Sequence, residues 1–418
     1  MKLWHYELQL LWRSKVALGS LLLLLLLATA SLLSGVQRID SQREAVAQIT
    51  ALQAEDAAAT AAAHGDSVDA GRAAYYAFQP TWNPPSPLAF AAVGMRDVAP
   101  IMLRVRALGL EAQIHDGDAF NPELALAGRF DFAFLLTFLL PLFTIALLHD
   151  LRSSETESGR ERILRSLPLG AGRLYLRRTT IRGLALWLCA GVPFTIVASC
   201  QGVPLGQILA VLGLAGLYQL FWMALCLLVS RRSWNSGVNA AALASCWVVI
   251  ALIAPALANV GIERAIPVEQ GAAIARAQRE AVNGAWDIPR EQTMQRFYAK
   301  YPQWSDSAPL GLEFHYKWYL AFHQNGDDHV APLVASYRNG IERRTSAAAK
   351  LGWVLPPVGL QVALTHMADT DMQSHLLYQD RIRAYHERLR HFFYGYLFTD
   401  KPFTKADYER IPRFEPEQ

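Results

Sequence analysis

The sequence contains few charged residues for its length, since only 18% of its 418 residues are Asp, Glu, Lys or Arg. Soluble domains typically carry about 25%. This deficit, together with 52% hydrophobic residues, indicates that part of the surface faces lipid. The net charge of +3 is small, and no Lys/Arg-rich run or nucleic-acid motif occurs. We therefore expect no nucleic-acid partner.

Cysteine is scarce as well, and no C-x-x-C pair is present for a zinc or redox site. All four cysteines (Cys189, Cys200, Cys226 and Cys246) lie in or beside apolar segments, so we expect no disulfide framework. The C-terminal part holds several histidines, but none with the close spacing of a metal-binding motif. We expect no metal and no other cofactor, and we interpret as solvated or hydrogen-bonded the side chains of His315, His323, His329, His366, His375, His386 and His391.

Sequence motifs of energy-converting or hydrolytic proteins are also missing. There is no G-x-x-x-x-G-K-[ST] loop, so we do not expect this chain to hydrolyse ATP itself. No G-x-S-x-G turn is present, and the apolar segments hold almost no ionisable residue, which argues against a carrier driven by protons or sodium. We expect a protein that is not itself an enzyme and whose energy comes from another subunit.

Long apolar runs are what the sequence does contain. A helix needs about 20 mainly apolar residues to cross a bilayer core, and five segments qualify. They predict a membrane protein of the all-α class, a five-span helical bundle with two mainly helical periplasmic regions. The predicted spans are 16–34, 129–149, 181–200, 205–229 and 238–260, and the predicted periplasmic regions are 35–128 and 261–418.

The first apolar run has two interpretations, a retained span or a cleaved signal peptide ending near the Ala-Thr-Ala triplet at 28–30. A retained span is favoured because the run is long and because an amphipathic segment, residues 1–15, precedes it. Trp4, Leu8, Leu11 and Trp12 recur there at helical spacing, which predicts a cytoplasmic helix at the membrane interface.

Basic residues orient the chain, because they concentrate in cytoplasmic loops. Lys2, Arg13 and Lys15 precede span one, and Arg231 and Arg232 lie between spans four and five. These segments fall on one face together with the 150–180 loop between spans two and three. We expect a multi-pass protein of the bacterial inner membrane with a cytoplasmic N-terminus. The arginines of that loop and its edge are Arg152, Arg160, Arg162, Arg165, Arg173, Arg177, Arg178 and Arg182.

The two predicted periplasmic regions differ in pattern. The first has a helical stretch at 41–63 and then a proline- and aromatic-rich run, 75–87, which we interpret as an extended packed loop or as a contact for cargo or a partner. The second predicts helices near 268–282, 290–300, 311–323, 330–349 and 371–396. The apolar stretch 351–365 is too short to span and contains Pro356-Pro357, which predicts a buried or interfacial helix.

The loop at 150–180 carries the most informative motif. An acid-x-acid-x-Gly run is followed by a short helical stretch, a Leu-x-Ser-x-Pro turn and basic residues before span three. This loop resembles the ATPase-coupling loop of type-2 ABC exporter permeases, in which the family's usual lysine would correspond to Arg177 or Arg178. The resemblance implies an ATPase-coupling site made of Glu155, Glu157, Gly159, Leu164 and Pro168, with Ser166 completing the turn.

A second resemblance covers the C-terminal part. Residues 355–371, Leu-Pro-Pro-Val-Gly-Leu-Gln-Val-Ala-Leu-Thr-His-Met-Ala-Asp-Thr-Asp, look like the "SP-hydrophobic-LQ … LA-x-TD" segment of one bacterial permease subfamily with a large periplasmic insertion of unknown function. The aromatic ending at 392–414 is similar to it as well. Permeases of this type normally have six spans, whereas the sequence predicts five, so we expect the C-terminal region outside the cytoplasm.

The resemblance implies a permease subunit of an ATP-driven ABC exporter. It would act with a separate ABC ATPase subunit, with a second permease half, identical or different, and with membrane lipid. The apolar spans fit amphiphilic cargo better than a small ion. Two alternatives remain: a non-transporting mechanotransmitter that relays ATPase motion to a periplasmic partner, and a membrane-anchored periplasmic binding protein.

Overall fold

The five apolar runs become five long helices, because a helix satisfies every backbone hydrogen bond within its own segment. The computed structural model describes residues 2–64, 69–115, 130–166, 171–232, 234–311 and 313–416. Among these residues, five helices are long and apolar enough to cross a membrane, which confirms the predicted number of candidate spans. They are Lys15–Ala63, Phe132–Glu157, Gly172–Cys200, Leu205–Ser230 and Ser236–Ala265.

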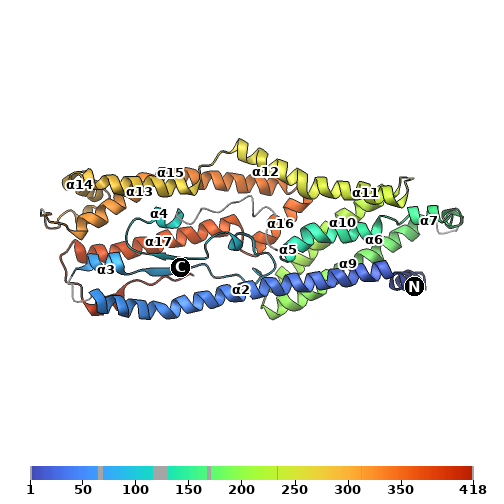
Figure 1. Cartoon of the computed structure of the whole chain (residues 1–418), viewed down its shortest axis with the longest axis horizontal. Helices are drawn as coiled ribbons and strands as arrows, with labels where there is room; N and C mark the ends of the chain where they lie inside the picture. Colours follow the sequence, from blue (N-terminus) through green and yellow to red (C-terminus); the bar gives the residue numbers. More distant parts are fainter. Residues whose placement is uncertain are drawn as a thin grey trace.

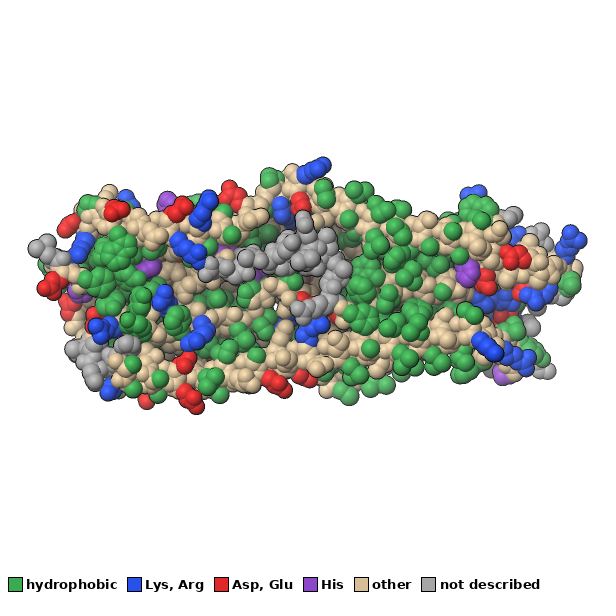
Figure 2. All heavy atoms as spheres, in the orientation of Figure 1, with side chains coloured by type: hydrophobic (Ala, Val, Ile, Leu, Met, Phe, Trp, Pro, Cys, Tyr) green, Lys and Arg blue, Asp and Glu red, His purple; other side chains and the backbone are tan. Residues whose placement is uncertain are grey.

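The molecule is elongated (Figure 1), and its buried hydrophobic residues form two separate cores. We call the half that contains the five candidate spans the bundle, and the half that contains most of residues 70–115 and 271–416 the head. Apolar side chains cover much of the bundle surface, whereas charged side chains gather over the head and at the opposite tip of the bundle (Figure 2). This distribution fits a membrane-associated protein.

Helix α2, Lys15–His64, runs without interruption from the bundle into the head. The sequence predicted two separate helices here, 16–34 and 41–63. They fuse because residues 35–40 contain no proline and their backbone can continue the helix. With a rise of about 1.5 Å per residue, the 50 residues span roughly 75 Å. Before it, α1 covers Lys2–Arg13, as predicted for the N-terminal helix.

The remaining candidate spans follow in sequence order. The second consists of α5 (Phe132–Phe134), a π-helical segment (Leu135–Leu139) and α6 (Leu140–Leu148). The third and fourth are α9 (Ala171–Cys200) and α10 (Leu205–Ser230). The fifth consists of α11 (Ser236–Trp247), a second π-helical segment (Val248–Ile253) and α12 (Ala254–Ala265). Each π segment precedes a proline, Pro141 or Pro255, whose missing N–H disturbs the regular ladder.

The loop at 88–93 closes the head-side end of the bundle. Its residues are almost fully buried, and the Phe90 ring packs against Phe194 of α9, which stacks on Phe132 with centroids 5.0 Å apart. The carboxylate of Asp131 fixes the loop by accepting a hydrogen bond from the Val93 N–H at 3.0 Å. The backbone of Phe90 comes so close to α2 that only glycine fits at position 35.

Helix α16, Pro356–Met367, is the predicted short apolar helix. Its residues Leu360 and Leu364, with the following Ala368, belong to the core of the bundle, so it is packed against the spans. Its 12 residues cover only about 18 Å, and it is not among the candidate spans of the described residues. The corner before it exposes Trp353.

The head is mainly helical but contains a small sheet that the all-α prediction missed. Strands β1 (Gln79–Trp82) and β2 (Met102–Val105) pair antiparallel, with Gln79 opposite Val105. The strand β1 lies inside the aromatic run at 75–87, after α3 (Ala70–Tyr76). There the expected packed, extended segment is confirmed, since Thr81 is buried and its hydroxyl lies 3.0 Å from the Tyr378 hydroxyl. Whether the exposed Tyr76 contacts a partner stays a prediction.

Long helices frame the rest of the head around an aromatic core. The segments predicted at 311–323 and 330–349 form a single helix, which continues through Pro332 because the chain on both sides is helix-forming and packed. The others lie close to their predicted bounds. The helices are α13 (Gly271–Gly284), α14 (Arg290–Lys300), α15 (Tyr316–Leu351) and α17 (Met372–Leu397), with a short α4 at Glu111–His115.

Candidate functional site

The predicted coupling loop forms a helical hairpin at the end of the bundle farthest from the head (Figure 1). Its arms are α7 (Ser153–Glu157) and α8 (Glu161–Arg165). Gly159 lies in the turn between them with φ of +71°, in the left-handed region that side chains with a Cβ rarely adopt. No atom lies near a Cβ built at this glycine, so the backbone angle alone explains the residue.

Glu155 is buried inside this hairpin and has two arginine partners. It accepts a hydrogen bond from Arg178 Nη1 at 3.0 Å and one from Arg160 Nε at 2.7 Å. Arg178 comes from α9, at the start of the third candidate span. The carboxylate that the sequence assigned to coupling therefore joins the hairpin to that span.

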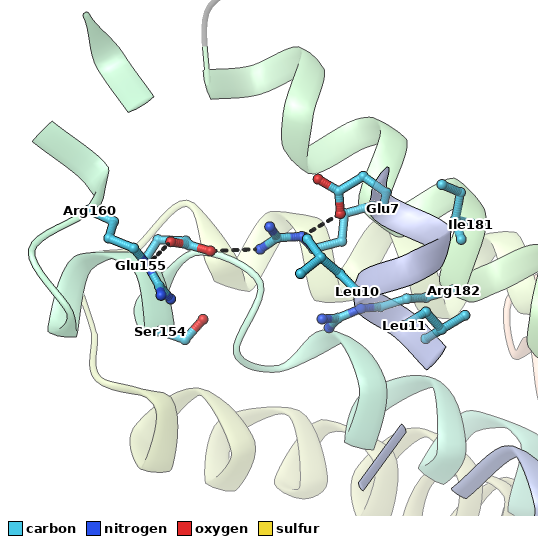
Figure 3. Close-up of a pocket in the computed structure, with 9 residues that line it drawn as sticks. Glu7, Leu10, Leu11, Ser154, Glu155, Arg160, Ile181 and Arg182 are labelled. Atoms are coloured by element: carbon cyan, nitrogen blue, oxygen red, sulfur yellow. Dashed lines mark hydrogen bonds and ion pairs between the residues drawn. The ribbon is translucent and has the colours of Figure 1, made fainter. Parts of the chain in front are cut away.

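Arg178 also reaches a third element, the N-terminal helix. Its Nε donates to Glu7 Oε2 at 3.1 Å, so one guanidinium bridges α1 and α7 (Figure 3). The Arg178, Glu7 and Glu155 side chains are only 13%, 7% and 9% exposed. Removing one member of a buried charge cluster leaves the others unpaired, typically at a cost of about 3–5 kcal/mol.

Glu157 joins the hairpin to the fifth candidate span. Its Oε1 accepts a hydrogen bond from the backbone N–H of Ser236, the first residue of α11, at 2.7 Å. A carboxylate is favourable at a helix N-terminus because the first N–H groups lack intrahelical partners. The hydroxyls of Ser153 and Ser236 lie 2.8 Å apart and close the same contact.

Arg152 and Glu161 hold the second arm of the hairpin. Arg152 Nε donates to Glu161 Oε1 at 2.8 Å, and its Nη1 donates to the Arg231 carbonyl, just after α10, at 3.2 Å. Thr156 donates to the other oxygen of Glu161. The hairpin is thus bonded directly to α9, to the residue after α10 and to α11, and it is linked to α1 through Arg178.

A cavity of about 360 Å³ lies between α1, the hairpin and α9 (Figure 3). Leu10, Leu11 and Ile181 form an apolar part of its lining, and Arg160, Arg178 and Arg182 a basic part. Arg182 donates to the Leu147 carbonyl and lies 3.4 Å from Asp150. Glu7 and Glu155 line the same cavity, so the geometry offers guanidinium groups, paired with carboxylates, beside an apolar wall.

The structure brings Glu155, Glu157 and Gly159 of the predicted site together. Leu164 is half-buried on α8, and Pro168 lies outside the described residues. The structure also distinguishes two neighbouring arginines. Arg178, and not Arg177, forms ion pairs with Glu7 and Glu155. On α1, the exposed side chains include Trp4, Leu8 and Trp12; their contact with a membrane interface stays a prediction.

Sequence reasoning missed Glu7, Arg152 and Glu161. An acid on an otherwise basic and apolar N-terminal helix was the available signal for Glu7, because a charge on such a helix needs a nearby partner. Nothing local indicates that this partner would be Arg178. The contact of Glu157 with Ser236 is likewise long-range.

A second charged cluster lies inside the head, at Asp327 of α15. Its carboxylate accepts hydrogen bonds from the backbone N–H groups of Leu110 and Glu111 and from Arg390 Nη2 at 2.7 Å. Glu111 pairs with Arg383 through two bonds of 2.8 and 2.9 Å. These contacts fix the segment before α4 between α15 and α17.

The pKa values of this cluster are strongly shifted. Burial raises the pKa of Glu111, but hydrogen bonds from Arg383 and His115 outweigh it and lower that pKa to about 2. Burial, reinforced by Arg390 and Arg106, lowers the pKa of His323 to about 3. The described residues contain no group of three or more His, Cys, Asp or Glu placed to hold a metal ion.

Comparisons with known proteins cover only part of the chain. Residues 272–417, which include α14, α15, α16 and α17, match the family model described as "Domain of unknown function (DUF3526)". No curated protein and no solved structure matches the chain. The family match covers neither the α7–α8 hairpin nor the candidate spans.

Proposed function

We propose that this chain is the permease subunit of an ATP-driven exporter and that a separate ABC ATPase chain docks on the α7–α8 hairpin. In this proposal the hairpin and α1 face the cytoplasm, the bundle crosses the bacterial inner membrane, and the head lies in the periplasm. A second permease half, identical or different, faces the apolar surface of the bundle.

The arrangement of the hairpin carries the proposal. It is a compact helical element at the tip of the molecule, with exposed residues and with hydrogen bonds to α9, to α11 and to Arg231 just after α10; α1 is linked to it through Arg178. An ATPase that pushes the hairpin would therefore move α1, α9 and α11 as a unit. Glu155 and Glu157 serve as internal links in this proposal, while the outer side of the hairpin contacts the ATPase.

One observation favours a second candidate function, mechanical transmission without transport. Helix α2 extends unbroken into the head, so motion at its bundle end reaches the head directly. The cavity between α5, α6, α9 and α10 is only about 10 Å³, near the minimum for one water molecule. A cargo pathway would then have to lie between two permease halves. The third hypothesis, a membrane-anchored periplasmic binding protein, requires no ATPase subunit.

Co-purification is the first test of the proposal. The full-length chain, tagged and solubilised in mild detergent from its native host, should carry a nucleotide-binding subunit at near-equal stoichiometry. Absence of such a subunit after chemical cross-linking in the membrane would contradict both the exporter hypothesis and the mechanical-transmission hypothesis. The hypothesis of a membrane-anchored binding protein would then remain.

The same complex tests the internal links. In Glu155→Gln and Glu157→Gln variants the complex should still assemble and hydrolyse ATP, while nucleotide no longer alters hydrogen exchange in the head. Glu269→Gln, which changes an exposed acid far from the hairpin, is the matched control. A nucleotide response in the head that survives both substitutions would refute the assigned role of the two carboxylates.

A further inference from the structure

We propose that the cavity beside the Glu7–Arg178–Glu155 cluster binds the phosphate of an anionic phospholipid headgroup. The inference rests on the proposed function only in placing this end of the bundle at a membrane face. It would hold whichever subunit docks on the hairpin.

The size and the mixed lining of the cavity fit this ligand. Its volume of about 360 Å³ lies within the range of about 300–1,000 Å³ usual for small-molecule sites. Arginines from three places meet in it: Arg160 from the turn before α8, and Arg178 and Arg182 from adjacent turns of α9. The apolar lining comes from Leu10 of α1 and Ile181 of α9.

The charges leave donors for a phosphate. The carboxylates of Glu7 and Glu155 accept from Arg178 and Arg160, and Asp150 accepts from Arg182, so a phosphate would be bound by the N–H groups that these ion pairs leave unused. A guanidinium has five N–H groups, and within the described part of the chain Arg178 uses its Nε and Nη1, whereas Arg182 uses its Nη1. The remaining N–H groups match the fork geometry with which arginine binds phosphate oxygens.

The surroundings favour a lipid over a free phosphate ion. Leu10 of α1 is 53% exposed and, together with Ile181, gives the cavity an apolar surface next to its arginines. The glycerol and upper acyl carbons of a lipid would lie on this surface while its phosphate faces the arginines. Basic residues next to a membrane face attract anionic lipids by about 1 kcal/mol each.

A lipid in this cavity would contact α1, the hairpin and α9 at once. It would thereby stabilise the contacts of the hairpin with α1 and α9, through which the hairpin is proposed to move the spans. The anionic lipid content of the membrane would then regulate how firmly the hairpin is coupled to the bundle.

Thermal stability in nanodiscs tests the inference on the permease chain alone. We compare discs of phosphatidylcholine with discs that contain phosphatidylglycerol, and we titrate inorganic phosphate in parallel. Wild type should be stabilised by phosphatidylglycerol. In Arg160→Gln/Arg182→Gln, the apparent affinity for this lipid should fall about fivefold per arginine removed. The matched control Arg162→Gln/Arg173→Gln removes equal charge from exposed positions of the same segments.

Each other outcome overturns the inference. Equal stabilisation of wild type by inorganic phosphate means a free-ion site, and equal loss in the control pair means general surface attraction. If the arginine variant does not fold, Leu10→Trp fills the cavity and keeps its charges. Stabilisation by phosphatidylglycerol that persists in Leu10→Trp also refutes the site. Because no ATPase is present, these outcomes are independent of the co-purification test.

Discussion

Arg178 is central to the ion pairs that link the hairpin to α1 and α9, yet the sequence alone does not distinguish it from Arg177. Its neighbour Arg177 has the same chemistry, and the loop motif fits either. Adjacent residues of a helix point about 100° apart, so only one of them can face α7. Its partners Glu7 and Glu155 lie 171 and 23 positions away in the chain, distances that no local pattern reveals.

His323 supports a prediction about acid stability. Because its pKa falls from about 6.5 in an unfolded chain to about 3 in the fold, the unfolded state binds a proton that the folded state does not. Below about pH 6.5, protonation of His323 in the unfolded state therefore lowers the free energy of unfolding as the pH falls, by up to about 1.4 kcal/mol per pH unit. Above that pH the group has no such effect. His323→Asn should make the melting temperature of the detergent-solubilised protein less dependent on pH in this window.

Asparagine suits this test because it can still accept the hydrogen bond that the Gly109 N–H donates to His323 Nδ1 at 3.2 Å. His329→Asn, on the exposed face of the same helix, should leave the pH dependence as it is. If both variants retain the slope of wild type, buried His323 is not the group responsible.

At the scale of elements, helix α2 contains two glycines with opposite surroundings. A Cβ at Gly35 would lie 2.0 Å from the Phe90 carbonyl oxygen, whereas a Cβ at Gly19 would meet no atom within 4 Å. The first glycine permits the 88–93 loop to seal the bundle. The second has no packing role that the structure shows.

Gly35→Ala and Gly19→Ala therefore form a matched pair. Gly35→Ala should destabilise the protein by about 1–3 kcal/mol, because a backbone clash must be relieved. Gly19→Ala should be neutral or stabilising by up to about 1 kcal/mol, since alanine is the better helix former. Melting curves in detergent compare the two, and equal melting temperatures would show that the loop does not bear on α2.

Element types were largely predictable, and element ends were not. Apolar runs located all five candidate spans, and the bounds of α14 and α17 lie within one residue of the predicted 290–300 and 371–396. Yet α9 begins already at Ala171, because a helix continues past the apolar boundary wherever its backbone allows. The predicted break inside α15 is absent, because packing in the head holds Pro332 within a single helix.

At the scale of the whole molecule, sequence reasoning predicted half of the candidate site. The acid-x-acid-x-Gly motif located Glu155, Glu157 and Gly159 because these residues are adjacent in the chain. The partners that give the carboxylates their role come from α1, α9 and α11, and their approach depends on how the spans pack. The small sheet of the head escaped prediction for the same reason, since its two short strands gain stability only from each other and the core.

Helix α2 packs in both cores. The rotation of the head relative to the bundle therefore depends on the number of residues in α2 between its contacts with the two. Arg43 contacts Gln201 near the bundle, while Gln53 contacts Gln79 of β1 in the head, at 3.1 and 2.8 Å. One alanine inserted after Gln48 would turn everything beyond it by about 100°. Hydrogen exchange in β1 should then accelerate, but not after an insertion following Ser305, an exposed turn residue. Unchanged exchange would mean that head and bundle rotate freely about α2.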